Sequence, residues 1–471
     1  MADVLILGGG MCGMSAAMML ARDGHSVTVI EKDNASPPAS LEEALDRWER
    51  PGVAQFRLVH YMHARFRHVL DAELPDVIEA LDAEGARRYD PIEAFFSPFI
   101  EDKARRPNDD QFQVITGRRP MLETVFARKA EGEPGVKVVR GVKVEALLTG
   151  AEAVPGVPHV VGVRTSTGDE IRADLVIDAM GRGSRVPQLL ADLGARPPYE
   201  EEEDCGFTYY AREFRGELPA QLGPPLAEHG SFSCLTLPSD NETWWVLLYF
   251  ASGDQPLKAF RHEETWMNVM QSLPFKAHWL QGEPVGGIEA MSGVMDRYRR
   301  FAVDGKPVVT GLLPLADASQ CTNPSLGRGI SLGLRHAQLL RGFVRRMNGD
   351  PGADALEWDD ITETNQTPWY RAQVAMDRAR VAGMLAARDG RPEAEPAPDD
   401  VQAQMTKAFF TAFPYDADLF RAFLEVMGCL STPEEVLSRP GMFEKVIAVA
   451  DGKEPMAMPG PNREELLQLI A

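Results

Sequence analysis

The chain has 471 residues and a formal net charge of −21. This acidic balance excludes a broad nucleic-acid surface, because phosphate contacts need clustered lysine and arginine. Its hydrophobic content of 44% and charged content of 25% are typical of a globular protein, and its length predicts about two or three domains. The five cysteines show no paired spacing, and an odd number fits a reducing compartment. Because no signal peptide and no apolar run of about 20 residues is found, we expect a cytoplasmic protein without a transmembrane segment.

The first predicted element is a short strand that runs directly into a glycine-rich turn. Val4 to Leu7 is apolar, and Gly8-x-Gly10-x-x-Gly13 then leads into a predicted helix from Met14 to Arg22. In a dinucleotide site the first glycine makes the tight turn, the second brings the backbone against the pyrophosphate, and the third allows close helix packing. The phosphates then lie at the positive end of the helix.

A second predicted strand, residues 26–30, ends at Glu31, about 20 residues beyond the glycines. A carboxylate at this distance is the expected partner of the ribose hydroxyls. The alternative is that the glycines only turn the chain and that Glu31 is a solvated strand end. Because strand, turn, helix and carboxylate occur together, the sequence favours a dinucleotide site.

The next segment is rich in loops and then helical in pattern. Residues 50–55 form a predicted turn before a predicted helix over 56–70, which carries His60, His63 and His68. Three histidines this close suggest a metal site. However, no carboxylate or thiol at ligand spacing completes one, so we expect no metal here.

A third unit begins with a predicted strand over 113–116 that leads into an amphipathic helix from about Arg119. Three alternating segments follow as the predicted strands of a small meander, at 137–140, 143–148 and 159–165. The apolar strand at 173–178 then ends in a glycine-rich loop. Such an unbroken apolar run is typical of a strand buried on both faces.

Longer β patterns with aromatic residues fill residues 186–299 and predict a separate antiparallel sheet that carries a substrate face. Its main hairpin is predicted over 232–250, with a turn at 239–241. We expect the acidic run at 200–204 to be a solvated loop.

The last part of the chain returns to the first sheet and then becomes helical. Residues 307–310 are predicted to resume the strands of the first domain, leading to Asp317 and a second glycine-rich loop. Residues 355–471 are mostly helical in pattern, with an interruption at 391–400 that is rich in proline and glutamate.

Four blocks in this order resemble the flavin-dependent monooxygenases of the para-hydroxybenzoate hydroxylase fold. The glycine turn with Glu31 corresponds to the site for the ADP part of FAD. Arg119, in Arg-Pro-Met-Leu-Glu, matches an arginine that contacts the flavin side of the cofactor. Asp178 lies in a segment that resembles the family's Asp-Gly motif, which is associated with the FAD pyrophosphate and with NAD(P)H. Asp317 resembles the aspartate of the Gly-Asp motif, which binds a ribityl hydroxyl, although Ala316 stands where that family has glycine.

The loop over 323–331 resembles the flavin-facing loop of the family. Its glycines permit close approach to the flavin ring, and the helix N-terminus that follows favours negative charge on it. Residues 50–55 with residues 60–63 resemble the subgroup that contains polyketide epoxidases of polyether biosynthesis, although Ala54 replaces the proline usual there. The cofactor-binding residues implied by the resemblance are Gly8, Gly10, Met11, Cys12, Gly13, Glu31, Lys32, Arg50, Gln55, Arg119, Asp178, Asp317, Gly327 and Gly329. No catalytic residue is assigned, and the flavin-facing loop contributes Asn323, Pro324, Gly327 and Gly329.

Each block taken singly has an ordinary structural interpretation. Arg119 could be a surface residue at a helix start, and Asp178 and Asp317 could be helix caps. The order of the blocks favours the flavin interpretation, which implies an α/β fold with a Rossmann-like FAD-binding domain, an inserted antiparallel-sheet substrate domain and a C-terminal helical region. The expected boundaries are 1–75, 111–185 and 300–350 for the FAD-binding domain, 76–110 and 186–299 for the substrate domain, and 351–471 for the helical region.

The function implied is that of an FAD-dependent monooxygenase. Such an enzyme transfers one oxygen atom from O₂, through a flavin C4a-hydroperoxide, to a lipophilic alkene or an aromatic ring of a natural-product-like substrate. The protein mainly positions the substrate and excludes water. The candidate substrate-lining residues are Phe207, Tyr209, Trp244 and Tyr249, although aromatic residues on a sheet are more often core.

NAD(P)H is the expected electron donor. Because only one glycine fingerprint is present, NAD(P)H either docks on the FAD-binding domain or serves a separate flavin reductase.

Two alternatives keep the fold and change the activity. The first is a flavin halogenase or a double-bond reductase. Halogenases usually carry a Trp-x-Trp-x-Ile-Pro segment, which Trp244-Trp245-Val246-Leu247 does not match. The second is a non-catalytic flavin-fold binding protein. Such proteins typically lose cofactor contacts, whereas this chain keeps Glu31, Arg119, Asp178 and Asp317.

Overall fold

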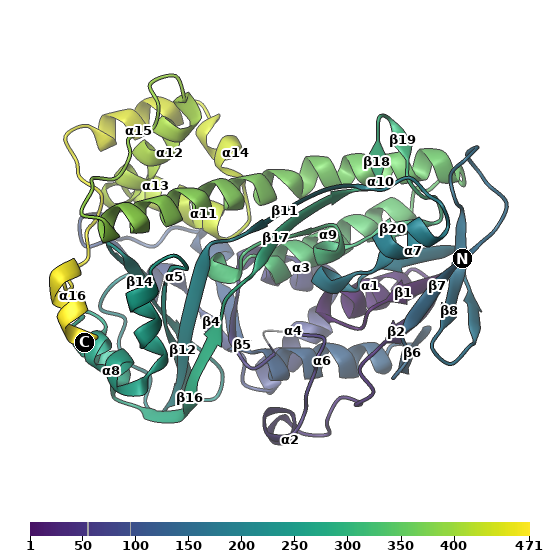
Figure 1. Ribbon diagram of the computed structural model, residues 1–471, viewed down its shortest axis with the longest axis horizontal. Helices are drawn as coiled ribbons and strands as arrows, with labels where there is room; N and C mark the ends of the chain where they lie inside the picture. The colour runs from purple at the N-terminus through teal and green to yellow at the C-terminus, as the bar shows by residue number, and fades with distance from the viewer. Residues whose placement is uncertain (54–55, 95) are drawn as a thin grey trace. The chain divides into compact units, whose positions relative to one another are not determined.

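The computed structural model describes residues 1–53, 56–94 and 96–471 (Figure 1). Ala54 and the predicted cofactor-binding residue Gln55 therefore lie outside the described residues. Two compact units divide the chain. Unit 1 consists of residues 1–86, 118–203 and 295–373, and unit 2 consists of residues 87–117, 204–294 and 374–471.

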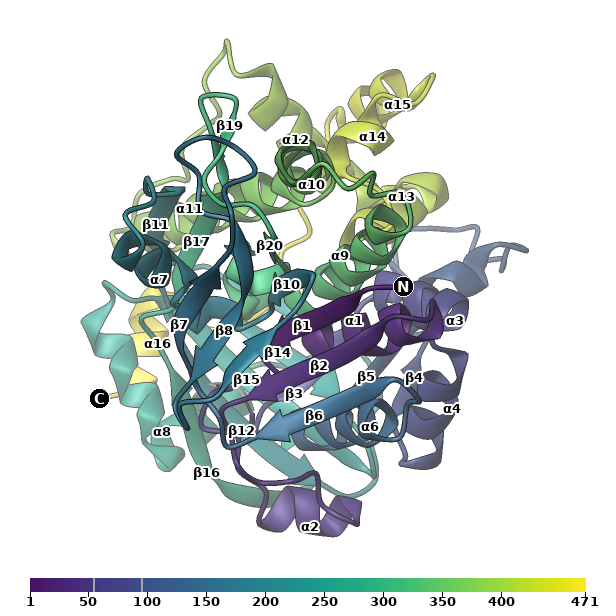
Figure 2. The ribbon, with the colours of Figure 1, turned by 90° about the vertical axis from the view of Figure 1, so that its right-hand side faces the viewer.

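A five-stranded parallel sheet forms the centre of unit 1, and its strands lie side by side in Figure 2. The order across the sheet is β20 (Leu312–Pro314), β10 (Leu175–Asp178), β1 (Asp3–Leu7), β2 (Ser26–Glu31) and β6 (Val136–Arg140). Leu7 pairs with Asp178 and Ile30, and Asp178 pairs with Pro314. The carboxyl ends of four strands therefore meet at one edge, where ligands bind in open α/β sheets.

The remaining elements of unit 1 surround or extend this sheet. Helix α1 (Met11–Arg22) packs against α6 (Arg119–Glu131) and α9 (Gly329–Val344). The other helices are α2 (Leu41–Asp46), α3 (Ala64–Glu73), α4 (Pro75–Ala83), α7 (Val186–Asp192) and α10 (Pro351–Asn365). Strands β7 (Val144–Thr149), β8 (Val160–Thr165) and β9 (Glu170–Arg172) form a small antiparallel sheet. A second three-stranded sheet has the order β11 (Tyr199–Asp204), β17 (Met295–Arg300) and β21 (Gln320–Cys321).

The prediction of one helix over residues 56–70 is wrong. Residues Val59–Met62 form strand β3, and helix α3 starts only at Ala64. The β-branched and aromatic residues at 59 and 61 favour extended backbone, and the Leu58 carbonyl accepts a hydrogen bond from the Arg119 backbone N–H. His60 therefore lies on a strand and His68 on a helix, so the three histidines do not share one helix.

Three further expectations for unit 1 need correction. Residues 137–140 belong to the parallel sheet as β6, so the meander contains β7, β8 and β9 instead. The strand that returns to the sheet is β20 at 312–314, not residues 307–310. The acidic run at 200–204 is part of strand β11, because arginines of the same unit neutralise it: Arg297 binds Glu200 and Glu202.

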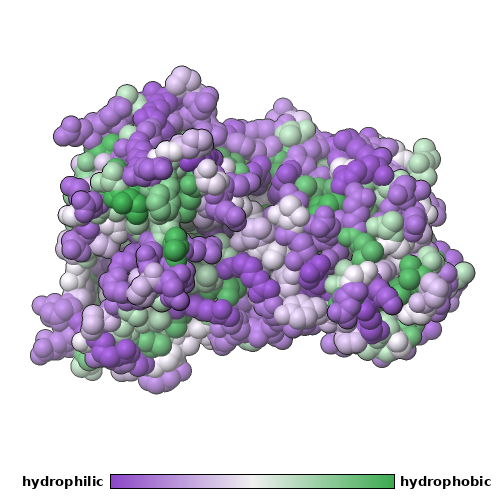
Figure 3. All heavy atoms as spheres, turned by 90° about the horizontal axis from the view of Figure 1, so that it is seen from above, coloured by the Kyte–Doolittle hydropathy of each residue, from purple (hydrophilic) through white to green (hydrophobic). Residues whose placement is uncertain are grey.

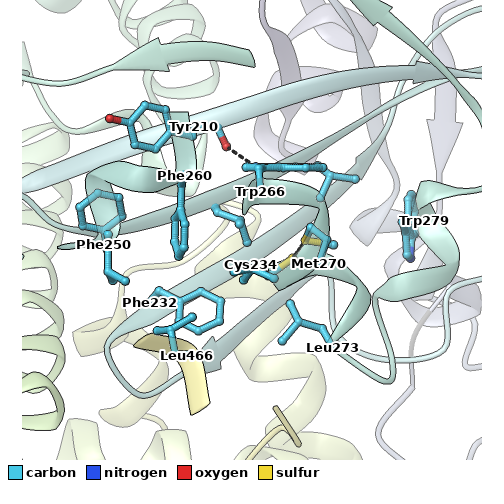
Figure 4. Packing of buried hydrophobic residues seen from close by; sticks show 14 of the residues in the cluster. Tyr210, Phe232, Cys234, Phe250, Phe260, Trp266, Met270, Leu273, Trp279 and Leu466 are labelled. Atoms are coloured by element: carbon cyan, nitrogen blue, oxygen red, sulfur yellow. Dashed lines mark hydrogen bonds between the residues drawn. The ribbon is translucent and has the colours of Figure 1, made fainter. Parts of the chain in front are cut away.

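Unit 2 is built around a five-stranded antiparallel sheet, as the sequence predicted. The order is β13 (Leu226–His229), β14 (Phe232–Pro238), β15 (Thr243–Ala251), β12 (Phe207–Arg215) and β16 (Glu283–Met291). Both faces of the central strands are buried by apolar side chains. On one face a cluster of aromatic residues packs under helix α8 (Glu263–Gln271) and helix α16 (Arg463–Leu469), with Trp266 donating its indole N–H to the Tyr210 carbonyl (Figure 4).

Helices form the rest of unit 2. They are α5 (Pro91–Ala94), α12 (Val401–Ala412), α13 (Ala417–Met427), α14 (Pro433–Leu437) and α15 (Met442–Ala450), and the long α11 (Thr367–Arg388) runs from residues of unit 1 into unit 2. Strands β4 (Arg87–Tyr89) and β5 (Val114–Arg118) pair with each other. Hydrophilic residues predominate on the face drawn in Figure 3, with smaller hydrophobic clusters between them. Within the described ranges, no helix is long and apolar enough to cross a membrane.

Candidate cofactor site

The glycine turn has three glycines in three different environments. Gly8 has φ +112°, which favours glycine, and a Cβ at this position would overlap the Ala179 carbonyl. A Cβ at Gly13 would overlap the Gly8 carbonyl, so this glycine permits the close packing of helix and strand. At Gly10 a Cβ would meet no atom of the described residues within 4 Å. The middle glycine therefore borders open space, where the expected role is approach to a pyrophosphate.

The N-terminus of α1 is suited to an anion. Gly10 is the N-cap residue and offers no side-chain cap, and no acidic residue lies in the first turn. Met11 is buried, whereas Lys32 is exposed. Burial and then the Asp317 carboxylate raise the pKa of the Cys12 thiol to about 12, so this thiol stays protonated at neutral pH.

Glu31 is buried at the end of β2, with 4% of its surface exposed. Its carboxylate accepts hydrogen bonds from the backbone N–H of Gly9 (2.8 Å) and of Asp33 (2.9 Å), and it forms an ion pair with Arg50 (2.6 Å). A carboxylate can accept about four hydrogen bonds. By this count the Glu31 carboxylate can accept one further hydrogen bond, such as that from a ribose hydroxyl.

Arg119 begins helix α6 and is held by two neighbours. Its Nε donates to Glu123 Oε1 (2.9 Å), and its Nη1 lies 3.2 Å from His60 Nε2. Glu123, which is 1% exposed, also accepts from Arg50 Nη1 (2.9 Å). The sequence reasoning did not include Glu123 or His60 in the site. The i,i+4 spacing of Arg119 and Glu123 was the signal for the first of them.

Asp178 is fully buried and orders the loop that follows β10. It accepts from Ser184 Oγ (2.5 Å) and from the Met180 backbone N–H (3.1 Å), and burial raises its pKa to about 6. In the same loop, Arg182 donates to the carbonyls of Thr322 (3.1 Å) and Met295 (3.3 Å). Asp178 thus shapes its own loop.

Asp317 follows β20 in a short turn at residues 316–318. Among the described residues, no hydrogen bond to its carboxylate is found. Burial raises the pKa of Asp317, while the charges of Arg182 and Arg119 oppose that rise. Ala316 has φ +52°, a left-handed conformation that explains the glycine usual in the family.

The Asp317 turn is held by a buried histidine that the sequence reasoning missed. The Ala316 backbone N–H donates to His336 Nδ1 (3.0 Å), and the ring of His336 stacks on Trp358 with centroids 4.6 Å apart. Burial lowers the pKa of His336 to about 3, so its ring is neutral and able to accept. No sequence motif marked this position.

The predicted flavin-facing loop is a tight, internally bonded turn. Asn323 Oδ1 accepts from the Ser325 backbone N–H (3.3 Å), and Gly327 has φ +65°. His63 Nε2 lies 2.5 Å from the Leu326 carbonyl and therefore donates to it. Pro324 starts the turn, and a Cβ at Gly329 would meet nothing within 4 Å in the part of the chain that the structure describes. The N-terminus of α9 thus borders open space, as the N-terminus of α1 does.

A cavity of unit 1 lies beside Asp317, with about 480 Å³ of empty volume, part of it open to solvent. Gly329, Gln366 and Trp369 are among its lining residues. The buried Arg328 also lines it, with its guanidinium 5.6 Å from the centre of the Trp369 ring. The Asp317 carboxylate therefore faces space rather than a protein partner.

The four candidate substrate-lining residues lie in unit 2 on two different faces of its sheet. Phe207, Tyr209 and Tyr249 share one cluster, in which the rings of Tyr209 and Tyr249 stack with centroids 5.2 Å apart. Trp244 belongs to the opposite cluster and donates its indole N–H to the Trp279 carbonyl (2.9 Å). All four are buried. Trp244 therefore does not share a surface with the other three.

Arg380 of helix α11 covers the first of these clusters. Its guanidinium lies 5.3 Å from the Phe207 ring centre and 5.1 Å from that of Tyr249. Burial raises the pKa of Tyr249 to about 12 and that of Tyr209 well above its usual value. Both phenols are therefore neutral at physiological pH.

The residues of unit 1 fit FAD. Gly10 and Gly329 leave open space at two helix N-termini, and the Asp317 carboxylate is available to a hydroxyl group. Glu31 would hold the adenosine ribose, the N-terminus of α1 the pyrophosphate, and Asp317 the ribityl chain. Arg119 would lie on the flavin side.

The chain is similar to known flavoproteins and monooxygenases. Residues 3–79 match the family model described as FAD dependent oxidoreductase. Squalene monooxygenase of Mus musculus is 30% identical over 350 residues, which are 73% of this chain and 54% of that protein. This chain thus spans about half the length of that relative. The 6-methylpretetramide 4-monooxygenase of Streptomyces rimosus is 24% identical over 416 residues, 83% of this chain and 87% of that protein.

Among solved structures, the flavin-dependent brominase Bmp2 superposes with a TM-score of 0.57 at 15% identity, over 96% of this chain and 99% of that one. This likeness shows the fold. The family match and the relatives together indicate an FAD-dependent oxidoreductase. The chain is similar to FAD-dependent monooxygenases, and its fold is that of the para-hydroxybenzoate hydroxylase type, as its motifs predicted.

Proposed function

We propose that this enzyme inserts one oxygen atom of O₂ into a lipophilic alkene or an aromatic ring of a natural-product-like substrate. The observation that carries the proposal is the placement of Glu31 and Asp317 after strands of one parallel sheet, beside two open helix N-termini. Arg119 is tied to Glu31 through Glu123 and Arg50. NAD(P)H supplies two electrons, so that substrate, O₂, NAD(P)H and a proton yield the oxygenated product, water and NAD(P)⁺. Bound FAD supplies the redox chemistry.

We assign FAD binding to unit 1 and substrate binding to unit 2. The aromatic face of Phe207, Tyr209 and Tyr249 supports a lipophilic substrate, because these side chains offer large apolar surfaces. Hydroxylation of a phenol benefits from a base that accepts the phenolic proton. Tyr209 and Tyr249 stay protonated and do not act as that base. The relative named squalene monooxygenase supports an alkene as substrate, and the relative named 6-methylpretetramide 4-monooxygenase supports a ring.

The test is oxygen transfer from labelled dioxygen. The purified protein, loaded with FAD, is given NADH or NADPH under ¹⁸O₂ with a panel of lipophilic alkenes and phenols. We expect substrate-stimulated NAD(P)H oxidation and one ¹⁸O atom in each product molecule. Activity that appears only after addition of a flavin reductase would establish a two-component system.

Three other results would contradict the proposal. Consumption of NAD(P)H with reduction of a double bond and no ¹⁸O incorporation indicates a reductase. A product halogenated in the presence of bromide or chloride indicates a halogenase. A protein that stays colourless after incubation with FAD indicates a binding protein that has lost the cofactor.

A further inference from the structure

A continuous chain of buried polar contacts runs through the FAD site of unit 1. It starts at Glu31, whose carboxylate binds Arg50 Nη2 at 2.6 Å. Arg50 Nη1 then binds Glu123 Oε2 at 2.9 Å. The other oxygen of Glu123 binds Arg119 at 2.8 Å, and Arg119 in turn reaches His60. Glu123 is thus the carboxylate shared by both arginines.

The middle of this chain is shielded from water. The side chains of Arg50 and Glu123 are 2% and 1% exposed, and that of Glu31 is 5% exposed. Burial acts to lower the pKa of Arg50, but the carboxylates of Glu123, Glu31 and Asp33 outweigh it and raise that pKa. Arg50 therefore stays charged. Removing one partner from such a buried group leaves a charge without compensation, which is costly.

His60 closes the chain at its other end. Its Nδ1 lies 3.0 Å from the Leu58 carbonyl and must donate to it, so Nε2 is left as an acceptor for Arg119. The same Leu58 carbonyl accepts the backbone N–H of Arg119 at 3.2 Å. Burial and the charge of Arg119 lower the pKa of His60 to about 3, so the ring is neutral. The backbone and the guanidinium of Arg119 are therefore both fixed relative to strand β3.

We propose that Glu123 is a positioning residue that couples the two ends of the FAD site, because it fixes Arg119 to Glu31 through Arg50. His60 completes the positioning of Arg119 from the opposite side. The inference rests on the proposed FAD site, in which Glu31 meets the ribose and Arg119 the flavin side. Groups held in place before binding lose little freedom when the ligand arrives. The FAD affinity should therefore depend on the two ends together.

The experiment is a double-mutant cycle on FAD affinity. Apoprotein is titrated with FAD, and flavin fluorescence gives the Kd for the parent, Glu31→Gln, Arg119→Met and the double variant. The same four titrations are made in a Glu123→Gln background. We expect the two substitutions to be non-additive by at least about 5-fold in the parent. In the Glu123→Gln background we expect them to be additive within about 2-fold.

A matched control is Glu133→Gln, which removes the partner of Arg22 elsewhere in unit 1 and should leave the coupling unchanged. Additivity in the parent, or coupling that persists without Glu123, would overturn the inference. If the parent does not bind FAD, both the proposed function and this inference fail. Tight FAD binding by the parent with additive effects of the two substitutions would refute the coupling alone.

A second pair of variants keeps the inference testable if Glu123→Gln does not fold. His60→Leu removes the acceptor for Arg119, whereas His60→Gln can place a carbonyl oxygen near Arg119 and an N–H near Leu58. We expect His60→Leu to weaken FAD binding by about 5-fold or more, and His60→Gln to restore most of it. Equal affinities of the two variants, at equal folded content by circular dichroism, would contradict a positioning role for His60.

Discussion

Replacement of Ala316 by glycine should stabilise the protein, which is unusual for a change from alanine to glycine. Ala316 has φ +52°, and a left-handed conformation costs a residue with a Cβ about 1–2 kcal/mol. Glycine removes that cost but adds freedom to the unfolded chain, which destabilises by about 0.4–1 kcal/mol. The net expectation is a gain of about 0.5–1 kcal/mol in the free energy of unfolding.

Urea-induced unfolding of the apoprotein measures this change, with the midpoint compared at unchanged slope. Ala318→Gly is the matched control. Ala318 lies in the same turn, is buried and lacks a positive φ, so glycine there should destabilise by about 0.5–1 kcal/mol. FAD affinity should stay equal or rise for Ala316→Gly, because the Asp317 turn is kept. If both substitutions lower the free energy of unfolding by the same amount, the turn at Ala316 is not left-handed and the match to the Gly-Asp motif fails.

Three further predictions concern the site and the stability of the two units. Asp317→Ala should weaken FAD binding by about 10-fold or more, since a hydrogen bond to a charged group contributes about 1.5–3 kcal/mol. An unchanged flavin content of the purified variant, measured by absorbance, would show that Asp317 does not contact FAD. Burial raises the pKa of Asp178 to about 6, so the free energy of unfolding should fall as pH rises from 4 to 6. Urea titrations of Asp178→Asn should show this fall reduced by about 2–3 kcal/mol. Identical pH profiles of parent and variant would contradict the raised pKa. Burial lowers the pKa of Lys276 to about 8, so the free energy of unfolding should rise with pH between 8 and 10. Lys276→Met should reduce this rise in urea titrations. The same dependence of the unfolding free energy on pH in parent and variant would contradict the lowered pKa.

Strong local periodicity made much of the fold predictable. The strand–turn–helix at the N-terminus was predictable because glycine spacing and apolar runs carry their own geometry, and the hairpin of β14 and β15 was predictable from its turn residues. The strand β3 was missed because residues 56–70 mix aromatic, histidine and arginine residues without a clear period. Strand β11 was missed because five consecutive acidic residues indicate a loop unless the arginines that neutralise them are known.

The site was predictable only where a motif marks it. Gly8, Glu31 and Asp317 lie at strand ends, so parallel pairing brings them to one edge of the sheet. His336 acts through a contact made by the folded chain, and nothing in its local sequence marks that contact. The i,i+4 spacing marks the contact of Glu123 with Arg119, but its contact with Arg50 arises only in the folded chain. The opposite faces of Trp244 and Tyr249 follow from the odd spacing between them on one strand.

An equilibrium titration of the apoprotein with FAD, followed by the visible absorption spectrum of the complex, tests the FAD site of unit 1 directly. We expect one FAD bound per chain, with the absorption bands of protein-bound flavin and weaker binding after Asp317→Ala. Binding that never saturates, or a complex that Asp317→Ala and Glu31→Gln both leave unchanged, would contradict the FAD site described for unit 1.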